Sequence, residues 1–115
     1  MVGDFSIEQI ANLKLVCPAV QKADEGGVTF YMLPRLQLPA GCEPREVDAL
    51  LCPASHSGYN SRLFFSEVIK TPQQRNWNAQ GVRILERNWH AFSWQVTATG
   101  LSLVQILQEH LDGLK

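Results

Sequence analysis

The pattern of apolar residues is clearest near the carboxyl end of the chain, where it repeats at the helical period. One arc of this segment, at about 100° per residue, holds Leu103, Val104, Ile106, Leu107, Leu111 and Leu114. Ser102 precedes the first residue of the arc. Gln105 follows Ser102 by three residues, which is the spacing of a capping box. We therefore predict an amphipathic helix that begins after Ser102 and packs on the rest of the protein. His110 lies within the apolar arc, so we expect it to be half-buried and hydrogen-bonded.

A second helix is predicted in the amino-terminal part of the chain. Ser6 and Gln9 have the same capping-box spacing, and Pro18 cannot continue a helix. The pattern predicts a helix over about Ile7 to Val16, with a modest apolar face.

Between the two helices the pattern changes to short β-type runs separated by turn residues. The predicted strands are Ala19–Ala23, Val28–Leu33, Glu46–Cys52 and Arg62–Ser66. Gly26 and Gly27 form a hairpin turn between the first two strands, and Pro34 bends the second strand or places it at an edge. The simplest topology is a four-stranded antiparallel meander with both helices on one face, which is an α+β fold.

The segment from Glu67 to Gly100 has weak periodicity, and we predict that it is irregular. It contains all three tryptophans, Trp77, Trp89 and Trp94. Irregular segments of this length are uncommon in small domains unless they are functional. We therefore expect a functional site within it.

Composition and charge narrow the class of protein. The 115 residues fit one domain, and the net charge of −1 does not favour a nucleic-acid partner. No apolar run is long enough to span a membrane, and the first residues do not resemble a secretory signal. The three cysteines lack metal-ligand spacing, so we expect free thiols, no metal or cofactor, and a cytoplasmic location.

Several short motifs follow one another in the second half of the chain. They are Tyr59-Asn60, Phe64-Phe65, Thr71-Pro72-Gln73, Gly81-Val82-Arg83-Ile84-Leu85, and Trp89 with Phe92-Ser93. Their order and spacing resemble the ubiquitin-conjugating-enzyme (UBC) family, in which Tyr-Pro, a Phe-containing strand, His-Pro-Asn, Gly-x-Ile-Cys-Leu and Trp occur in turn. The Trp-x-x-Phe-Ser segment is similar to the Trp-x-x-Trp-Ser of a short, divergent bacterial branch found in ubiquitin-like modification operons. The resemblance covers the chain from about Phe5 to Leu114.

The resemblance implies a carrier for a ubiquitin-like protein that works with an activating enzyme, in a bacterial pathway of the type linked to phage defence. In that family a Cys thiolate takes up the activated carboxyl terminus as a thioester, and an Asn steadies the oxyanion. Here the Cys position is Ile84 or Arg83, neither of which can carry an acyl group. Gln73 stands at the Asn position and retains an amide that can donate to an oxyanion.

Two other residues are candidate nucleophiles. Cys42 lies in the turn after the second strand, at the end of the sheet where the fourth strand exits toward Gln73. We expect its thiol to be exposed there. Ser93 follows His90 by three residues, so on a helix His90 would lie beside it as a base. The loop around His56 is a third, weaker candidate site.

Each of these candidates has a simpler interpretation. Cys42 can be a turn residue without a role, and the aromatic residues around Ser93 can be core residues. The sequence therefore leaves three functions open: a carrier with a non-standard nucleophile, a non-catalytic UBC-like module that binds a ubiquitin-like protein or an activating enzyme, or an unrelated α+β interaction protein.

Overall fold

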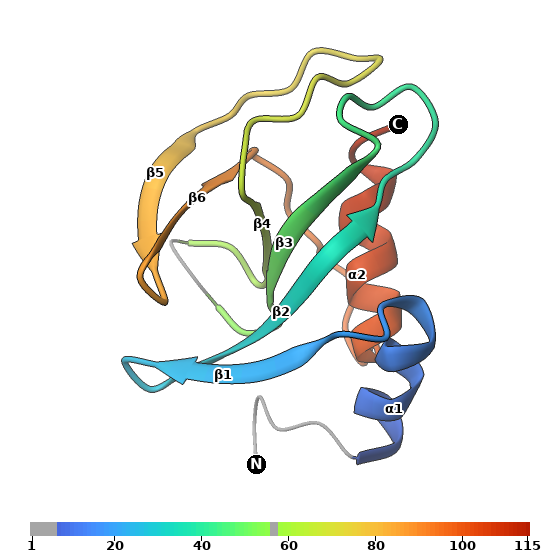
Figure 1. Ribbon diagram of the computed structural model, residues 1–115, viewed down its shortest axis with the longest axis vertical. Helices are drawn as coiled ribbons and strands as arrows, with labels where there is room; N and C mark the ends of the chain where they lie inside the picture. The colour runs from blue at the N-terminus through green and yellow to red at the C-terminus, as the bar shows by residue number, and fades with distance from the viewer. Residues whose placement is uncertain (1–6, 56–57) are drawn as a thin grey trace.

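The computed structural model describes residues 7–55 and 58–115, which form one α+β domain. Its elements are α1 (Ile7–Val16), β1 (Gln21–Glu25), β2 (Val28–Gln37), β3 (Glu46–Cys52), β4 (Arg62–Phe65), β5 (Ala79–Ile84), β6 (Arg87–Ala91) and α2 (Leu103–Asp112). The strands form one antiparallel sheet in the order β1-β2-β3-β4-β6-β5 (Figure 1). The predicted helix–meander–helix order is confirmed.

The prediction of an irregular segment from Glu67 to Gly100 was wrong in its central part. A hairpin of β5 and β6 lies there, and it joins the sheet where His90 pairs with Phe65. Gly81 sits at a register shift between the two strands, and most of β5 is exposed or half-buried. The strand therefore carries no clean two-residue alternation, which is why the sequence pattern did not reveal it.

The sheet curls into a half-barrel, and apolar residues cover both of its faces (Figure 1). Leu13 of α1 and Leu107 of α2 belong to one buried cluster with Phe65 of β4, so both helices pack on the same face, as predicted. The opposite face holds a second cluster with Phe64 and Trp89 at its centre. This second cluster ties the β5–β6 hairpin to the meander.

The two helices differ in how firmly they are anchored. α2 has the predicted capping box between Ser102 and Gln105, and it buries one complete face. α1 buries only Leu13, and the capping box predicted at Ser6 lies outside the described residues. The side-chain oxygen of Gln9 accepts a hydrogen bond from the backbone N–H of Leu103, which links the two helices. Neither helix is long and apolar enough to cross a membrane.

Candidate functional site

The structure places Cys42 in the expected neighbourhood but not in the expected environment. Its loop runs beside the segment after β4, since Glu43 pairs with Lys70 and Gly41 lies against Pro72. The thiol, however, points into the core, where it donates to the carbonyl of Leu114 at 3.7 Å, and Cys42 is only 1% exposed. Burial raises the pKa of the Cys42 thiol above its ordinary value. The expected exposed thiol was therefore wrong, because the loop packs against the end of α2.

Neither the other two cysteines nor the residues at the position of the resembled family's cysteine offer an exposed thiol. Cys17 and Cys52 are both buried, and burial raises the pKa of each thiol. Ile84 and Arg83 are the residues that the resemblance placed at the cysteine position; Ile84 belongs to the second core cluster, and Arg83 is exposed on β5. In residues 7–55 and 58–115 no three His, Cys, Asp or Glu side chains gather to hold a metal ion.

His90 and Ser93 do not form the predicted pair. His90 lies on β6, where consecutive side chains alternate between the faces of the sheet, so residues three apart point in opposite directions. His90 instead accepts a hydrogen bond at Nδ1 from the backbone N–H of Gly81, at 3.2 Å. The predicted dyad needed a helix, and this segment is a strand followed by extended chain.

Gln73 is exposed in the segment between β4 and β5. Its backbone carbonyl accepts a hydrogen bond from the Thr71 hydroxyl, which tightens the turn around Pro72. Within the described part of the chain, no hydrogen bond joins Gln73 to Ser93 or Cys42. The structure therefore does not bring the four predicted site residues together.

Ser93 belongs instead to a polar cluster of four residues, Tyr59, Arg62, Asn78 and Ser93, which we call the Tyr59 cluster. Ser93 Oγ lies 2.9 Å from the Tyr59 hydroxyl, and Asn78 Nδ2 donates to the same hydroxyl at 2.8 Å. The Arg62 guanidinium donates to Asn78 Oδ1 and lies over the Tyr59 ring, 4.2 Å from its centroid.

Three separate parts of the chain build this cluster. Tyr59 lies in the segment before β4, Arg62 is the first residue of β4, Asn78 directly precedes β5, and Ser93 follows β6. The two ends of the β5–β6 hairpin hold Ser93 in place, because the backbone N–H of Ser93 donates to the carbonyl of Asn76 at 2.7 Å. Ser93 and Asn78 are exposed and Tyr59 is half-buried, so a second molecule can reach the hydroxyl groups.

Arg62 carries the one formal charge within the Tyr59 cluster, and it is only 3% exposed. Among the described residues its nearest partners are an amide oxygen and two aromatic rings, those of Tyr59 and Phe64, and its Nε has no hydrogen-bond partner. A buried cation without a carboxylate favours negative charge nearby. The pKa of the Tyr59 hydroxyl is accordingly lowered, first by its hydrogen bond with Ser93 and further by Asn78 and the charge of Arg62.

Comparisons of the chain with family models, curated proteins and solved structures gave no match. In the sequence, Tyr59 stands out only as part of the motif that resembles the UBC family, and neither Arg62 nor Asn78 belongs to a recognisable motif. No spacing rule links these residues, because their contacts depend on the hairpin that the pattern did not predict.

A second surface feature lies along α1. Ile7 is 87% exposed and Leu15 is 83% exposed, and with Ala11 they form a stripe at spacings of four residues. A pocket of about 370 Å³ lies between residues 16–19, which follow Leu15, and the bend in β2 around Arg35. α1 thus exposes an apolar stripe, and the pocket begins at the last residue of the helix.

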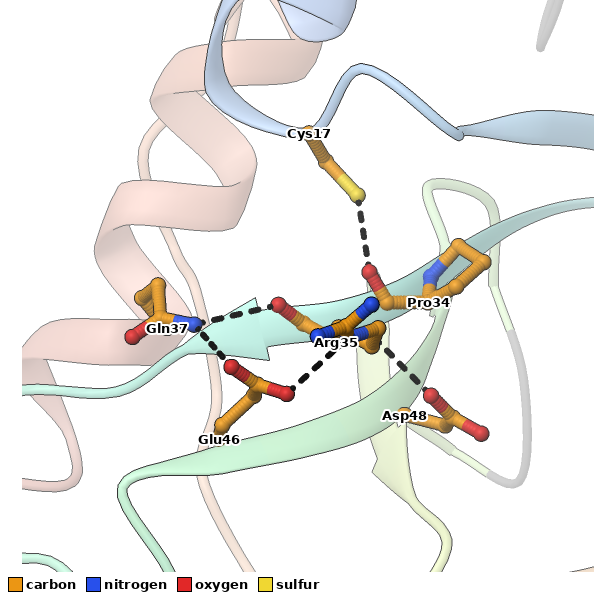
Figure 2. Close-up of polar contacts among 6 residues, drawn as sticks. All are labelled: Cys17, Pro34, Arg35, Gln37, Glu46 and Asp48. Carbon is orange, nitrogen blue, oxygen red and sulfur yellow. Dashed lines mark hydrogen bonds and ion pairs between the residues drawn. The ribbon is translucent and has the colours of Figure 1, made fainter.

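Several residues that line this pocket make polar contacts, which Figure 2 shows. Cys17 donates its S–H to the carbonyl of Pro34 at 3.4 Å, and the Arg35 N–H donates to Asp48 Oδ1 at 2.9 Å. Arg35 has φ of 56°, at the register shift that confirms the bend predicted at Pro34. Gln37 and Arg35 both donate to the Glu46 carboxylate, and these bonds lower the pKa of Glu46.

Proposed function

We propose that this chain carries a ubiquitin-like protein as an ester on Ser93, in a bacterial conjugation pathway that includes an activating enzyme. One observation supports Ser93: its hydroxyl is exposed and lies 2.9 Å from the hydroxyl of Tyr59, beside a buried cation. Cys42 is not proposed, because its thiol is buried against Leu114. The order of motifs that resembles the UBC family supplies the partners.

The proposed reaction is acyl transfer to a hydroxyl. Ser93 Oγ attacks the carboxyl terminus of the ubiquitin-like protein, which the activating enzyme holds as a thioester. The bond from oxygen to the carbonyl carbon forms, and the carbon–sulfur bond of the thioester breaks. The thiolate of the activating enzyme leaves with the electron pair, and the proton lost by the Ser93 hydroxyl balances its charge, so that a thiol is released overall. The product is an oxyester, from which an amine, a hydroxyl or water then takes the acyl group.

Reconstitution with the activating enzyme, the ubiquitin-like protein and ATP tests this proposal, with intact-mass spectrometry of this chain as the readout. We expect an adduct that resists thiol and is cleaved by hydroxylamine. Ser93→Ala should abolish the adduct and Cys42→Ala should leave it in place. An adduct lost to thiol, or one that persists in Ser93→Ala, would contradict the assignment to Ser93.

A second function, a non-catalytic module that docks an activating enzyme, is favoured by a different observation. α1 exposes Ile7 and Leu15 almost completely, although apolar side chains on a helix usually face a core. In the resembled family the first helix docks the activating enzyme. We propose that the stripe of Ile7, Ala11 and Leu15 does so here.

This docking function is tested by calorimetry with the activating enzyme. Ile7→Ser and Leu15→Ser should each leave stability within about 0.5 kcal/mol, because exposed positions tolerate change. The same variants should weaken binding. Val68→Ser is the matched control, since Val68 is also an exposed apolar residue but lies after β4. Equal binding by all three variants would refute docking through α1.

A further inference from the structure

We infer that Tyr59 is the base that takes the proton of Ser93, with Arg62 and Asn78 as positioning residues, so that Ser93 reacts with activated acyl and phosphonyl groups. This inference rests on the proposed role of Ser93 but not on the identity of its protein partner. It also replaces His90, the base predicted from the sequence, with a residue from another part of the fold.

The hydrogen bonds of the cluster determine in which direction the proton between Ser93 and Tyr59 is donated. Arg62 can only donate, so the atom of Asn78 that it contacts is the amide oxygen, and the NH₂ group of Asn78 therefore faces Tyr59. The Tyr59 oxygen accepts from Asn78 at 2.8 Å. When Tyr59 is a phenolate it can only accept, so Ser93 must then donate its proton along the 2.9 Å contact.

The charges around Tyr59 support this ionised form. Arg62, from β4, lies 4.2 Å from the centroid of the ring, and Asn78 and Ser93 on the hairpin side are neutral. Because Arg62 is buried, water solvates its charge only weakly, and among the described residues no carboxylate is paired with it. A phenolate at Tyr59 supplies a negative charge beside it. The pKa of the Tyr59 hydroxyl is lowered, which also favours the phenolate.

The reactive step forms one bond, breaks one bond and moves one proton. The lone pair of Ser93 Oγ forms a bond to an electrophilic carbon or phosphorus atom, and the proton of the hydroxyl passes to the Tyr59 oxygen. The bond from the electrophile to its leaving group breaks, and the leaving group departs with the electron pair. With a fluorophosphonate, the P–F bond breaks and fluoride leaves.

A fluorophosphonate probe on the full chain tests the inference without any partner protein. Peptide mass spectrometry should locate the label on Ser93. Tyr59→Phe keeps the ring over Arg62 and removes only the hydroxyl, so we expect it to fold and to label at least about 100-fold more slowly. His90→Gln is the matched control and should label at the wild-type rate.

The pH dependence separates a base from a merely structural residue. The wild-type labelling rate should rise with pH through an inflection below the ordinary range of tyrosine, and Tyr59→Phe should lose that inflection. Labelling of Ser93 in Tyr59→Phe at the wild-type rate would overturn the inference, as would a folded wild-type protein that is not labelled at Ser93.

These outcomes are distinct from those that test the carrier function. If the probe labels Ser93 through Tyr59 but no ubiquitin-like protein is taken up, the carrier proposal fails and the inference stands. If the oxyester with the ubiquitin-like protein forms equally fast in the wild type and in Tyr59→Phe, the carrier proposal stands and the inference fails.

Discussion

The hydroxyl oxygen of Ser61 lies 2.8 Å from Nε2 of His110, in a contact that joins the chain just before β4 to the buried face of α2. His110 is hydrogen-bonded as predicted, but at 2% exposure it is more deeply buried than the sequence suggested. Burial, and secondarily the charge of Arg62, lower the pKa of His110 from its ordinary 6.5 to about 4. The folded protein therefore holds a neutral imidazole at neutral pH.

We predict from this contact that the protein loses stability in mild acid. Between pH 6.5 and about 4 the unfolded chain binds a proton at His110 that the folded chain does not, so the free energy of unfolding falls as the pH falls. The total loss below pH 4 is about 3 kcal/mol, since each pKa unit corresponds to about 1.4 kcal/mol. Urea unfolding at a series of pH values measures it.

The variant His110→Gln separates this effect from general acid denaturation. It removes the titrating group and keeps a polar side chain near Ser61, so its stability should depend less on pH in this window. His90→Gln is the control, because His90 is only half-buried and lies outside the contact. Equal acid sensitivity in His110→Gln and the wild type would show that His110 is not responsible.

We predict that all three thiols are unreactive in the folded protein. Cys17, Cys42 and Cys52 are buried, and burial raises the pKa of each thiol, which lowers the fraction of reactive thiolate. Ellman's reagent should modify them only slowly without denaturant and all at once in guanidinium. One fast-reacting thiol in native buffer, mapped to Cys42, would restore Cys42 as a candidate nucleophile.

Gly41 should be far less tolerant of substitution than Gly27. Both have positive φ, 92° and 79°, so alanine is strained at either position. A Cβ at Gly41 would also lie 2.7 Å from Cγ of Pro72, whereas a Cβ at Gly27 would meet no atom within 4 Å. We expect Gly27→Ala to cost about 1 kcal/mol and Gly41→Ala about 1–3 kcal/mol more in chemical denaturation. Similar losses would disprove the close packing of this loop.

The β5–β6 turn offers a stabilising change. Leu85 and Glu86 have φ of 51° and 63°, values that a two-residue hairpin turn requires but that these residues rarely adopt. Glu86→Gly relieves this strain at an exposed position and should raise stability by about 0.5–1 kcal/mol. Glu86→Ala is the control and should give no such gain. A loss of stability in Glu86→Gly, measured by thermal unfolding, would contradict this reading of the turn.

The sequence by itself determined the two helices, the four-stranded meander and their order. These elements rest on local chemistry. The Ser102–Gln105 capping box starts α2, the Gly26-Gly27 turn supplies the positive φ of the first hairpin, and short apolar runs between turn residues mark the strands. Each signal spans only a few residues, so it can be read without knowledge of the rest of the chain.

The tertiary structure alone decided the β5–β6 hairpin and, through it, the candidate site. β5 is a half-exposed edge strand, so no periodic pattern marks it, and the hairpin is held by Trp89 in the core cluster across the sheet. The hairpin brings Ser93 to Tyr59, 34 positions away in sequence, and the packing of a different loop against the end of α2 buries Cys42. Contacts between distant segments depend on how the sheet curls, which residue spacing does not encode.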